Sequence, residues 1–152
     1  LKKDIKEIKY LSDKYLTGTS LRLRKVEQDT KIQYKLTQKK EETPLKKGVR
    51  RINTIYLTNI EYEKLLDLEG HTIEKTRKVI EVDSIRIAID EIRIKEEEIY
   101  IAEVEFETEK EMNSYLFPLS YFKEITNDPK YSGYELAFKN SKQPRPFNLN
   151  HK

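Results

Sequence analysis

The chain has 152 residues, and 38% of them are charged although the formal net charge is only +3. This length allows one domain with a full core, and the mixed charges argue against a protein that coats nucleic acid by charge alone. The lack of cysteine excludes disulfides, thiolate zinc sites and thiol nucleophiles, and no stretch reaches the ~20 apolar residues of a membrane span, so we expect a cytoplasmic protein without a membrane partner.

The first third of the chain predicts strands joined by short turns. Residues 4–10 fit a short helix or a strand, and residues 13–16 fit a strand that ends at the turn 17–19. Alternation of polar and apolar residues then predicts a hairpin of strands 21–27 and 31–39, with its turn at 28–30. A loop follows at 40–48, marked by Pro44 and Gly48.

The rest of the chain predicts further strands with helices between and after them. The predicted strands are 50–57, 72–80, 85–92 and 98–107. Thr58 with Glu61, and Thr108 with Glu111, are capping boxes that predict a helix ending at Gly70 and another ending at Pro118. Residues 118–138 predict two short helices. We therefore expect one domain over residues 1–139 and a flexible polar tail over 140–152.

Charged residues recur at two-residue spacing in several of these strands. Glu103 and Glu105 leave the same face of one strand, which makes them candidate ligands for a cation. Arg22 and Arg24 repeat this spacing with positive charge, and so do Lys75 and Arg77. Lys35 and Lys39 are four residues apart and also share one face of their strand.

So many charges cannot be placed in a dry core, because burying one isolated ion costs several kcal/mol. Two arrangements keep them near water. One is an open antiparallel sheet whose charged face meets the solvent, and the other is a closed barrel with a wet, charged lumen and helices outside. The spacing alone leaves both open.

An ordered series of short motifs makes this chain similar to one known family. In chain order the motifs are YLTGTSLRLR at 15–24, KLTQK at 35–39, EKTR at 74–77, ID at 89–90, AEVEF at 102–106, ITNDPKY at 125–131 and ELA at 135–137. The order of the series is specific, since any one motif occurs by chance. Over residues 13–137 the chain resembles the CYTH domain, whose members are also called triphosphate tunnel metalloenzymes.

The resemblance implies an α+β fold: a closed antiparallel β-barrel of about eight strands, with a charged tunnel and helices packed outside. It implies hydrolysis of inorganic triphosphate, thiamine triphosphate or a nucleoside triphosphate with Mg²⁺ or Mn²⁺, and adenylate cyclases are relatives. By position it assigns phosphate binding to Arg22, Arg24, Lys35, Lys39, Lys75 and Arg77. It assigns catalysis and metal binding to Glu103 and Glu105, with Asp90 as a further metal ligand.

The chain also departs from the family pattern. The first strand of the family carries E-x-E-x-K, a motif that this sequence does not contain. Because the sequence starts without methionine and a barrel that lacks a strand would leave an unpaired edge, we expect that strand to precede Leu1. Positions that often carry acids in the family hold residues 51–54 and Ala88 here, which weakens the expectation of a second metal ion.

Two functions from different classes follow. The first is a metal-dependent hydrolase acting on a small triphosphorylated substrate. The second is a non-catalytic module that binds nucleotides or polyphosphate and has an incomplete metal site. A basic loop around Arg50 could contact RNA, but Glu41, Glu42 and the lack of stacking aromatic residues there argue against nucleic acid. The sequence does not predict the oligomeric state.

Overall fold

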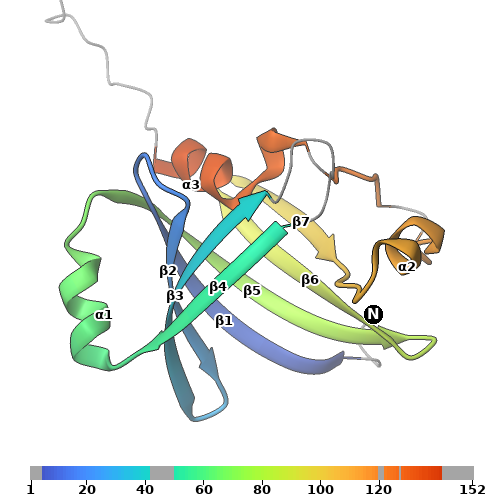
Figure 1. Ribbon diagram of the computed structural model, residues 1–152, viewed down its shortest axis with the longest axis horizontal. Coiled ribbons are helices and arrows are strands. Elements are labelled where there is room, and N and C mark those ends of the chain that lie inside the picture. Colours follow the sequence, from blue (N-terminus) through green and yellow to red (C-terminus); the bar gives the residue numbers. More distant parts are fainter. Residues whose placement is uncertain (1–4, 42–49, 120–121, 127, 142–152) are drawn as a thin grey trace, which may run out of the picture.

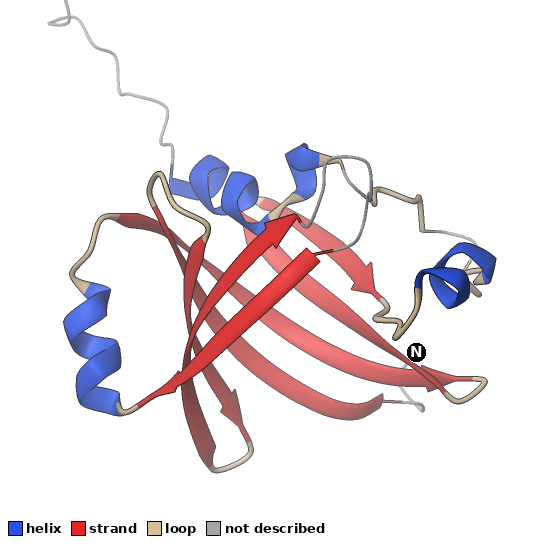
Figure 2. Cartoon of the chain, in the orientation of Figure 1, coloured by secondary structure: helices blue, strands red, loops and turns tan. Residues whose placement is uncertain are grey.

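One curved sheet of seven antiparallel strands dominates the structure, a computed structural model that describes residues 5–41, 50–119, 122–126 and 128–141 (Figures 1 and 2). The strands are β1 (Ile5–Leu16), β2 (Leu21–Gln28), β3 (Lys31–Glu41), β4 (Arg50–Leu57), β5 (Gly70–Val82), β6 (Ile85–Ile94) and β7 (Glu97–Glu103). The helices are α1 (Asn59–Leu66), α2 (Glu109–Ser114) and α3 (Gly133–Ser141), with a 3₁₀ turn, η2 (Pro129–Tyr131). The predicted α+β class is confirmed.

Tight turns join successive strands and fix their register. Asp29, Asp83 and Lys95 adopt positive φ angles of 55°, 51° and 56°, and each lies between two paired strands. Asp, which occupies two of these three positions, tolerates this backbone region better than β-branched residues do. The predicted strands are present, with two corrections. Residues 5–16 form one continuous strand, and β7 ends at Glu103 instead of residue 107.

The strand order is β4-β3-β2-β1-β5-β6-β7, so β1 is central and the edges are β4 and β7. No pairing joins these two edges within the described part of the chain, and the predicted closed barrel is therefore not confirmed. Strand β4 is an open edge of the sheet: among the described strands it pairs only with β3, and seven of its eight residues are exposed. The curvature still brings β3 and β4 in front of β5 and β6 in Figure 1.

Two apolar clusters pack the sheet against α3 and against the segment that follows β7. The first joins Ile73, Ile92 and Ile94 of the sheet to Leu136 and Ala137 of α3. The second forms on Ile80, Ile87 and Ile89 and is covered by Val104, Phe117, Leu119 and Phe122. The first cluster lies on the same face of β5 as Lys75 and Arg77, because residues two apart share a face.

Helices α1 and α2 begin where the sequence predicts, but both end earlier. The capping box of Thr58 and Glu61 starts α1, which ends at Leu66 because β5 already begins at Gly70. Helix α2 starts after Thr108 and ends at Ser114. No helix in the described residues is long and apolar enough to cross a membrane.

The C-terminal region also differs from its prediction. The sequence predicts two short helices over residues 118–138, but the residues described between 118 and 126 form no helix; a 3₁₀ turn follows at η2, and α3 continues to Ser141. Asn140 and Ser141 thus belong to the fold instead of the predicted tail: the Asn140 side chain accepts a hydrogen bond from the backbone of Lys95. The remaining predicted tail (142–152) and most of the predicted loop (42–48) lie outside the described residues.

Gly70 permits the close approach of β5 to β1. A Cβ at this position would lie 2.5 Å from the backbone oxygen of Tyr15, and a backbone atom cannot move aside as a flexible side chain can. We expect Gly70→Ala to lower the free energy of unfolding by about 1–3 kcal/mol, measured by urea denaturation. Thr72→Ala, at an exposed position of the same strand, should cost less than about 1 kcal/mol. Equal midpoints for the two variants would contradict this packing.

Candidate active site

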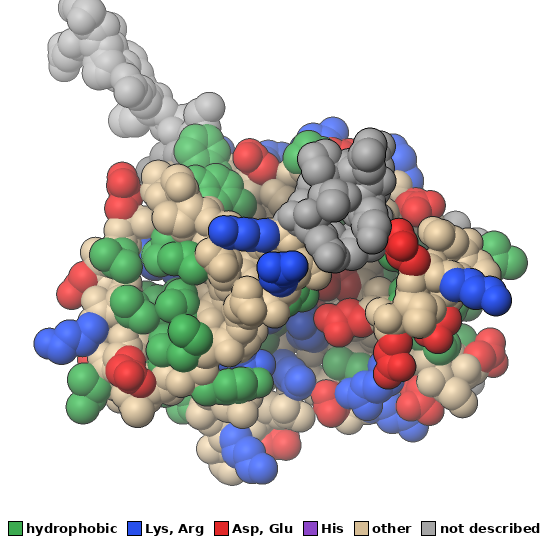
Figure 3. All heavy atoms as spheres, viewed as in Figure 1, with side chains coloured by type: hydrophobic (Ala, Val, Ile, Leu, Met, Phe, Trp, Pro, Cys, Tyr) green, Lys and Arg blue, Asp and Glu red, His purple; other side chains and the backbone are tan. Residues whose placement is uncertain are grey.

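Strand register places most of the predicted site residues on one face of the sheet. Asp13, Arg24, Lys35 and Tyr56 lie opposite one another across β1 to β4, and directly paired residues share a face. The same face includes alternate residues on these strands and on β5 and β6. We use the name charged inner face for eight charged residues of this face: Asp13, Arg22, Arg24, Lys35, Lys39, Lys75, Arg77 and Asp90. In Figure 3, basic and acidic side chains lie together in the recess at the centre of this view.

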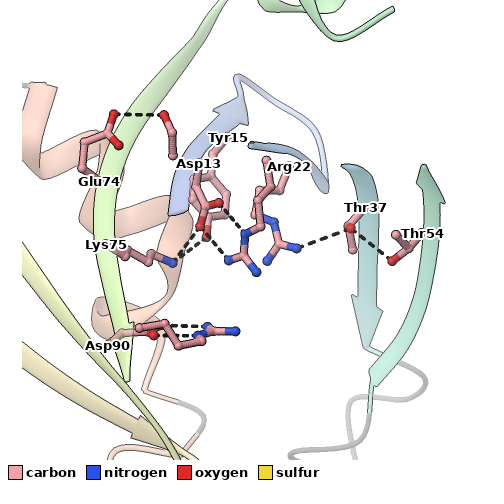
Figure 4. Close-up of polar contacts among 11 residues, drawn as sticks. Asp13, Tyr15, Arg22, Thr37, Thr54, Glu74, Lys75 and Asp90 are labelled. Carbon is pink, nitrogen blue, oxygen red and sulfur yellow. Dashed lines mark hydrogen bonds and ion pairs between the residues drawn. The ribbon is translucent and has the colours of Figure 1, made fainter. Parts of the chain in front are cut away.

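Asp13 is the hub of the charged inner face. Its carboxylate is 0% exposed and accepts two hydrogen bonds from Arg24, from Nε at 2.5 Å and from Nη2 at 2.7 Å. Lys75 Nζ lies 3.0 Å from Asp13 Oδ2 and donates to Tyr15 Oη at 3.2 Å. Figure 4 shows Asp13 and Lys75 turned toward each other. Burial would raise the pKa of Asp13, but the hydrogen bonds and charge of Arg24, with the charge of Lys75, hold that pKa well below its usual value.

A second ion pair joins β5 and β6. Arg77 donates from Nε and Nη2 to the two oxygens of Asp90 at 2.7 and 2.8 Å. Desolvation alone would lower the pKa of Arg77, but the hydrogen bonds and charge of Asp90 raise the pKa of Arg77 above its usual value. Three of the six predicted cations, Arg24, Lys75 and Arg77, are thus held by buried carboxylates.

Arg22 is buried without a carboxylate partner. It is 8% exposed, its Nη2 lies 3.4 Å from Thr37 Oγ1, and its Nε has no hydrogen-bond partner among the described residues. Figure 4 shows Arg22 turned toward Thr37. Desolvation and the charge of Arg24 lower the pKa of Arg22. A buried guanidinium with a free donor is the group that a phosphate oxygen would satisfy.

Lys39 and Glu103 show that the two ends of the sheet approach each other. They lie on β3 and β7, which are far apart in the strand order, but the charge of Glu103 raises the pKa of Lys39. Lys39 is an exposed residue, yet desolvation of its ammonium and the charge of Arg22 outweigh the effect of Glu103 and lower the pKa of Lys39 to about 8. Lys35, whose ammonium lies 5.4 Å from the ring centre of Tyr56, also has a lowered pKa because of desolvation and the charge of Arg24.

The predicted acids are more dispersed than the cations. Glu103 ends β7 and Glu105 follows it outside the strand, and both are exposed. Asp90 is buried and both of its oxygens bind Arg77. Within the described residues no three acids or histidines form a group that could hold a metal ion. Carboxylate oxygens nevertheless suit Mg²⁺, which proteins bind with one or two carboxylates while substrate phosphates supply further ligands.

Four further residues of this face, Asp13, Tyr15, Thr37 and Thr54, were not predicted as site residues. Asp13 and Tyr15 contact Lys75, and Thr37 lies between Arg22 and Thr54, with 3.1 Å between the two threonine hydroxyls. For Asp13 a signal was present, because it alternates with Leu11 and Tyr15 on the buried face of a strand. A carboxylate at such a position requires a cationic partner.

Comparison with solved structures identifies proteins of similar fold. The structure called hypothetical protein NE1496 matches with a TM-score of 0.55 at 23% identity, covering 88% of this chain and 87% of that one. A second structure of NE1496, there called an inorganic triphosphatase, matches with a TM-score of 0.54 at 21% identity over the same shares. The PH1819 protein of Pyrococcus horikoshii OT3 matches with a TM-score of 0.57 at 19% identity, covering 72% of this chain and 71% of that one.

These matches establish the fold alone, because all three are below 25% identity. No protein-family model matches the sequence, and no curated protein matches it. The description of the charged inner face therefore rests on its own geometry: cations from three strands, two buried carboxylates that hold three of them, and a buried arginine with a free donor.

The convergence of β3 and β7 predicts opposite effects of two substitutions on Lys39. Arg22→Gln removes a like charge and should raise the pKa of Lys39 above about 8, whereas Glu103→Gln removes an opposite charge and should lower it. In the wild type, the inner face should lose positive charge as the pH rises through about 8. NMR titration of labelled lysine side chains measures these shifts. If Glu103→Gln leaves the pKa of Lys39 unchanged, the two strands do not converge.

Proposed function

We propose that this protein binds the phosphate chain of a triphosphate on the charged inner face and hydrolyses its terminal phosphoanhydride with Mg²⁺ or Mn²⁺. Arg22 carries this proposal: it is buried, its Nε is unpartnered among the described residues, and other cations surround it. A cation in that position is unfavourable alone and becomes favourable when an anion arrives.

The chemistry matches the groups available. Hydrolysis of a phosphoanhydride requires a held phosphate chain, neutralised charge and a water placed in line, and little covalent help from the protein. Six cations supply the first two requirements: Arg22, Arg24, Lys35, Lys39, Lys75 and Arg77. Each charge-assisted hydrogen bond contributes about 1.5–3 kcal/mol, so several bonds along three phosphates favour a triphosphate over a monophosphate.

Glu103 and Glu105 would hold the divalent cation together with the substrate phosphates. When bound, the cation would neutralise phosphate charge and activate or orient the attacking water. Asp90 could join only by giving up its bonds to Arg77. Glu103 already acts electrostatically on Lys39 and Arg77, which is consistent with a place beside the phosphates.

We also propose that the chain is a CYTH protein and that its sheet closes into a tunnel. Two independent observations support this membership: the ordered motifs of the sequence, and a likeness of fold to NE1496, a protein called an inorganic triphosphatase. Closure would cover β4, whose inner-face residues Ile52 and Tyr56 are 53% and 66% exposed. The substrate could be inorganic triphosphate, thiamine triphosphate or a nucleoside triphosphate.

One observation favours a second candidate, a module that binds polyphosphate without hydrolysing it. The described residues contain no group of three acids or histidines able to hold a metal, whereas the cationic part of the site is well formed. Binding without turnover in the presence of Mg²⁺ and Mn²⁺ would support this alternative.

The role of Arg22 predicts a specific loss of affinity. Arg22→Gln should weaken tripolyphosphate binding by roughly ten- to a hundredfold, because it removes a charge-assisted hydrogen bond. Isothermal titration calorimetry measures the affinity. The control is Lys25→Gln, on the opposite face of the same strand, where Lys25 pairs with Glu27. Equal losses in the two variants would indicate nonspecific attraction and contradict the proposed site.

The role of the acids predicts loss of metal-dependent turnover. Glu103→Gln and Glu105→Gln should each reduce phosphate release from tripolyphosphate by at least about a hundredfold, while tripolyphosphate still binds without metal. Phosphate release with Mg²⁺ or Mn²⁺ is the measurement. Glu98→Gln, on the other face of β7, should retain wild-type turnover. Full activity of both site variants would exclude the assigned roles.

A further inference from the structure

The cations of the charged inner face fall into two groups, those paired with a carboxylate and those without one. Arg24 and Lys75 are fixed by the shared carboxylate of Asp13, at distances of 2.5–3.0 Å, and Arg77 is paired with Asp90. Arg22, Lys35 and Lys39 have no ion pair within the described residues. Arg24 and Lys75 lie on β2 and β5, the two strands that flank β1. The carboxylate of Asp13 on the central strand therefore connects the strands on both sides of it.

Asp13 cannot be a ligand of the substrate in this arrangement. Its side chain has no exposed surface, and both of its oxygens are occupied by cationic donors. A carboxylate touching the phosphate chain would also repel it. Any influence of Asp13 on bound phosphate must therefore act through Arg24 and Lys75.

Two physical effects give Asp13 such an influence. The two-point hydrogen bond from Arg24 fixes the plane of the guanidinium, which leaves its remaining donors in set directions. The negative charge of Asp13 also acts on Arg22: desolvation and the charge of Arg24 lower the pKa of Arg22, and the charge of Asp13 partly offsets them. Lys75 is further restrained by Tyr15, whose hydroxyl accepts its hydrogen bond.

We propose that Asp13 is a positioning residue that holds Arg24 and Lys75 in the geometry needed for a phosphoryl group, while the cations without carboxylate partners supply most of the attraction for the phosphate chain. This inference rests on the proposed function and adds a division of labour to it. Orientation of the reacting phosphoryl group comes from the cations fixed by Asp13, and long-range attraction comes from Arg22, Lys35 and Lys39.

Asp13→Asn separates these two contributions. The amide keeps the size of the side chain but places a donor against cationic donors, and it raises the net charge of the site by one. We expect kcat for tripolyphosphate to fall by about ten- to a hundredfold, the equivalent of one charge-assisted hydrogen bond, while KM changes less than about threefold. Ser12→Ala, on the opposite face of β1 where Ser12 donates to Glu74, should leave both constants unchanged.

A spectroscopic measurement tests the inference without relying on turnover. The Nε–H of Arg24 should exchange slowly with solvent in the wild type, because it donates to a carboxylate without exposed surface, and quickly in Asp13→Asn. Slow exchange and unchanged kcat in Asp13→Asn would overturn the positioning role. If the wild type neither binds nor hydrolyses triphosphates, the proposed function fails, and the exchange of Arg24 alone decides whether Asp13 holds the guanidinium.

A double variant covers the case in which Asp13→Asn does not fold. Asp13→Asn with Lys75→Gln removes one charge of each sign and keeps the buried charge balanced. Because Asp13 acts partly through Lys75, the loss of kcat in the double variant should be at least threefold smaller than the product of the single losses; where Asp13→Asn is unfolded, the double variant should lose more than Lys75→Gln alone, because Arg24 is released as well. A loss equal to the product of the single losses, a double variant no worse than Lys75→Gln, or slow exchange of Arg24 Nε–H in the double variant would overturn the inference.

Discussion

The structure depends on keeping ionised groups inside one curved sheet. Removing one partner of a buried ion pair lowers the free energy of unfolding by about 3–5 kcal/mol, so a buried charge needs a neighbour of opposite charge to be stable. Asp13 and Asp90 meet this constraint by binding Arg24, Lys75 and Arg77. These bonds cross from β1 to both neighbouring strands and from β5 to β6. Charge pairing and strand register consequently specify the same arrangement, and a shift by one residue would separate all three pairs.

The strands, the capped helices and the basic residues of the site could be predicted because each leaves a local signal. Alternation along β3 places Lys35, Thr37 and Lys39 on one face, and the pair of Thr58 and Glu61 marks the start of α1. Two-residue spacing likewise groups Arg22 with Arg24. These features depend on residues close in sequence, and the structure agrees with them. The roles of these residues and of the acids came from resemblance to a family and remain predictions.

The sequence could not supply the contacts that depend on curvature and register between distant strands. Asp13 pairs with Lys75, which is 62 positions away in the chain. Lys39 interacts electrostatically with Glu103, although their strands, β3 and β7, are far apart in the strand order. Neither relation follows from spacing. Closure of the sheet was inferred from the family, and the pairing ends at β4 and β7 within the described residues. Ile52 and Tyr56 at this edge are exposed, so the open side of the sheet leaves two large apolar side chains in solvent.

The unequal treatment of the cations connects stability with function. A protein selected for stability alone would give Arg22 a carboxylate partner as it does Arg24, because desolvation and the neighbouring charge of Arg24 oppose the ionised form of Arg22. The sheet instead places Thr37, a neutral group, beside it, and leaves Lys39 with a pKa lowered to about 8. Such unpaired cations cost folding free energy that a polyanion can return on binding. Pairing some cations and not others therefore gives this face both a fixed geometry and an unsatisfied charge.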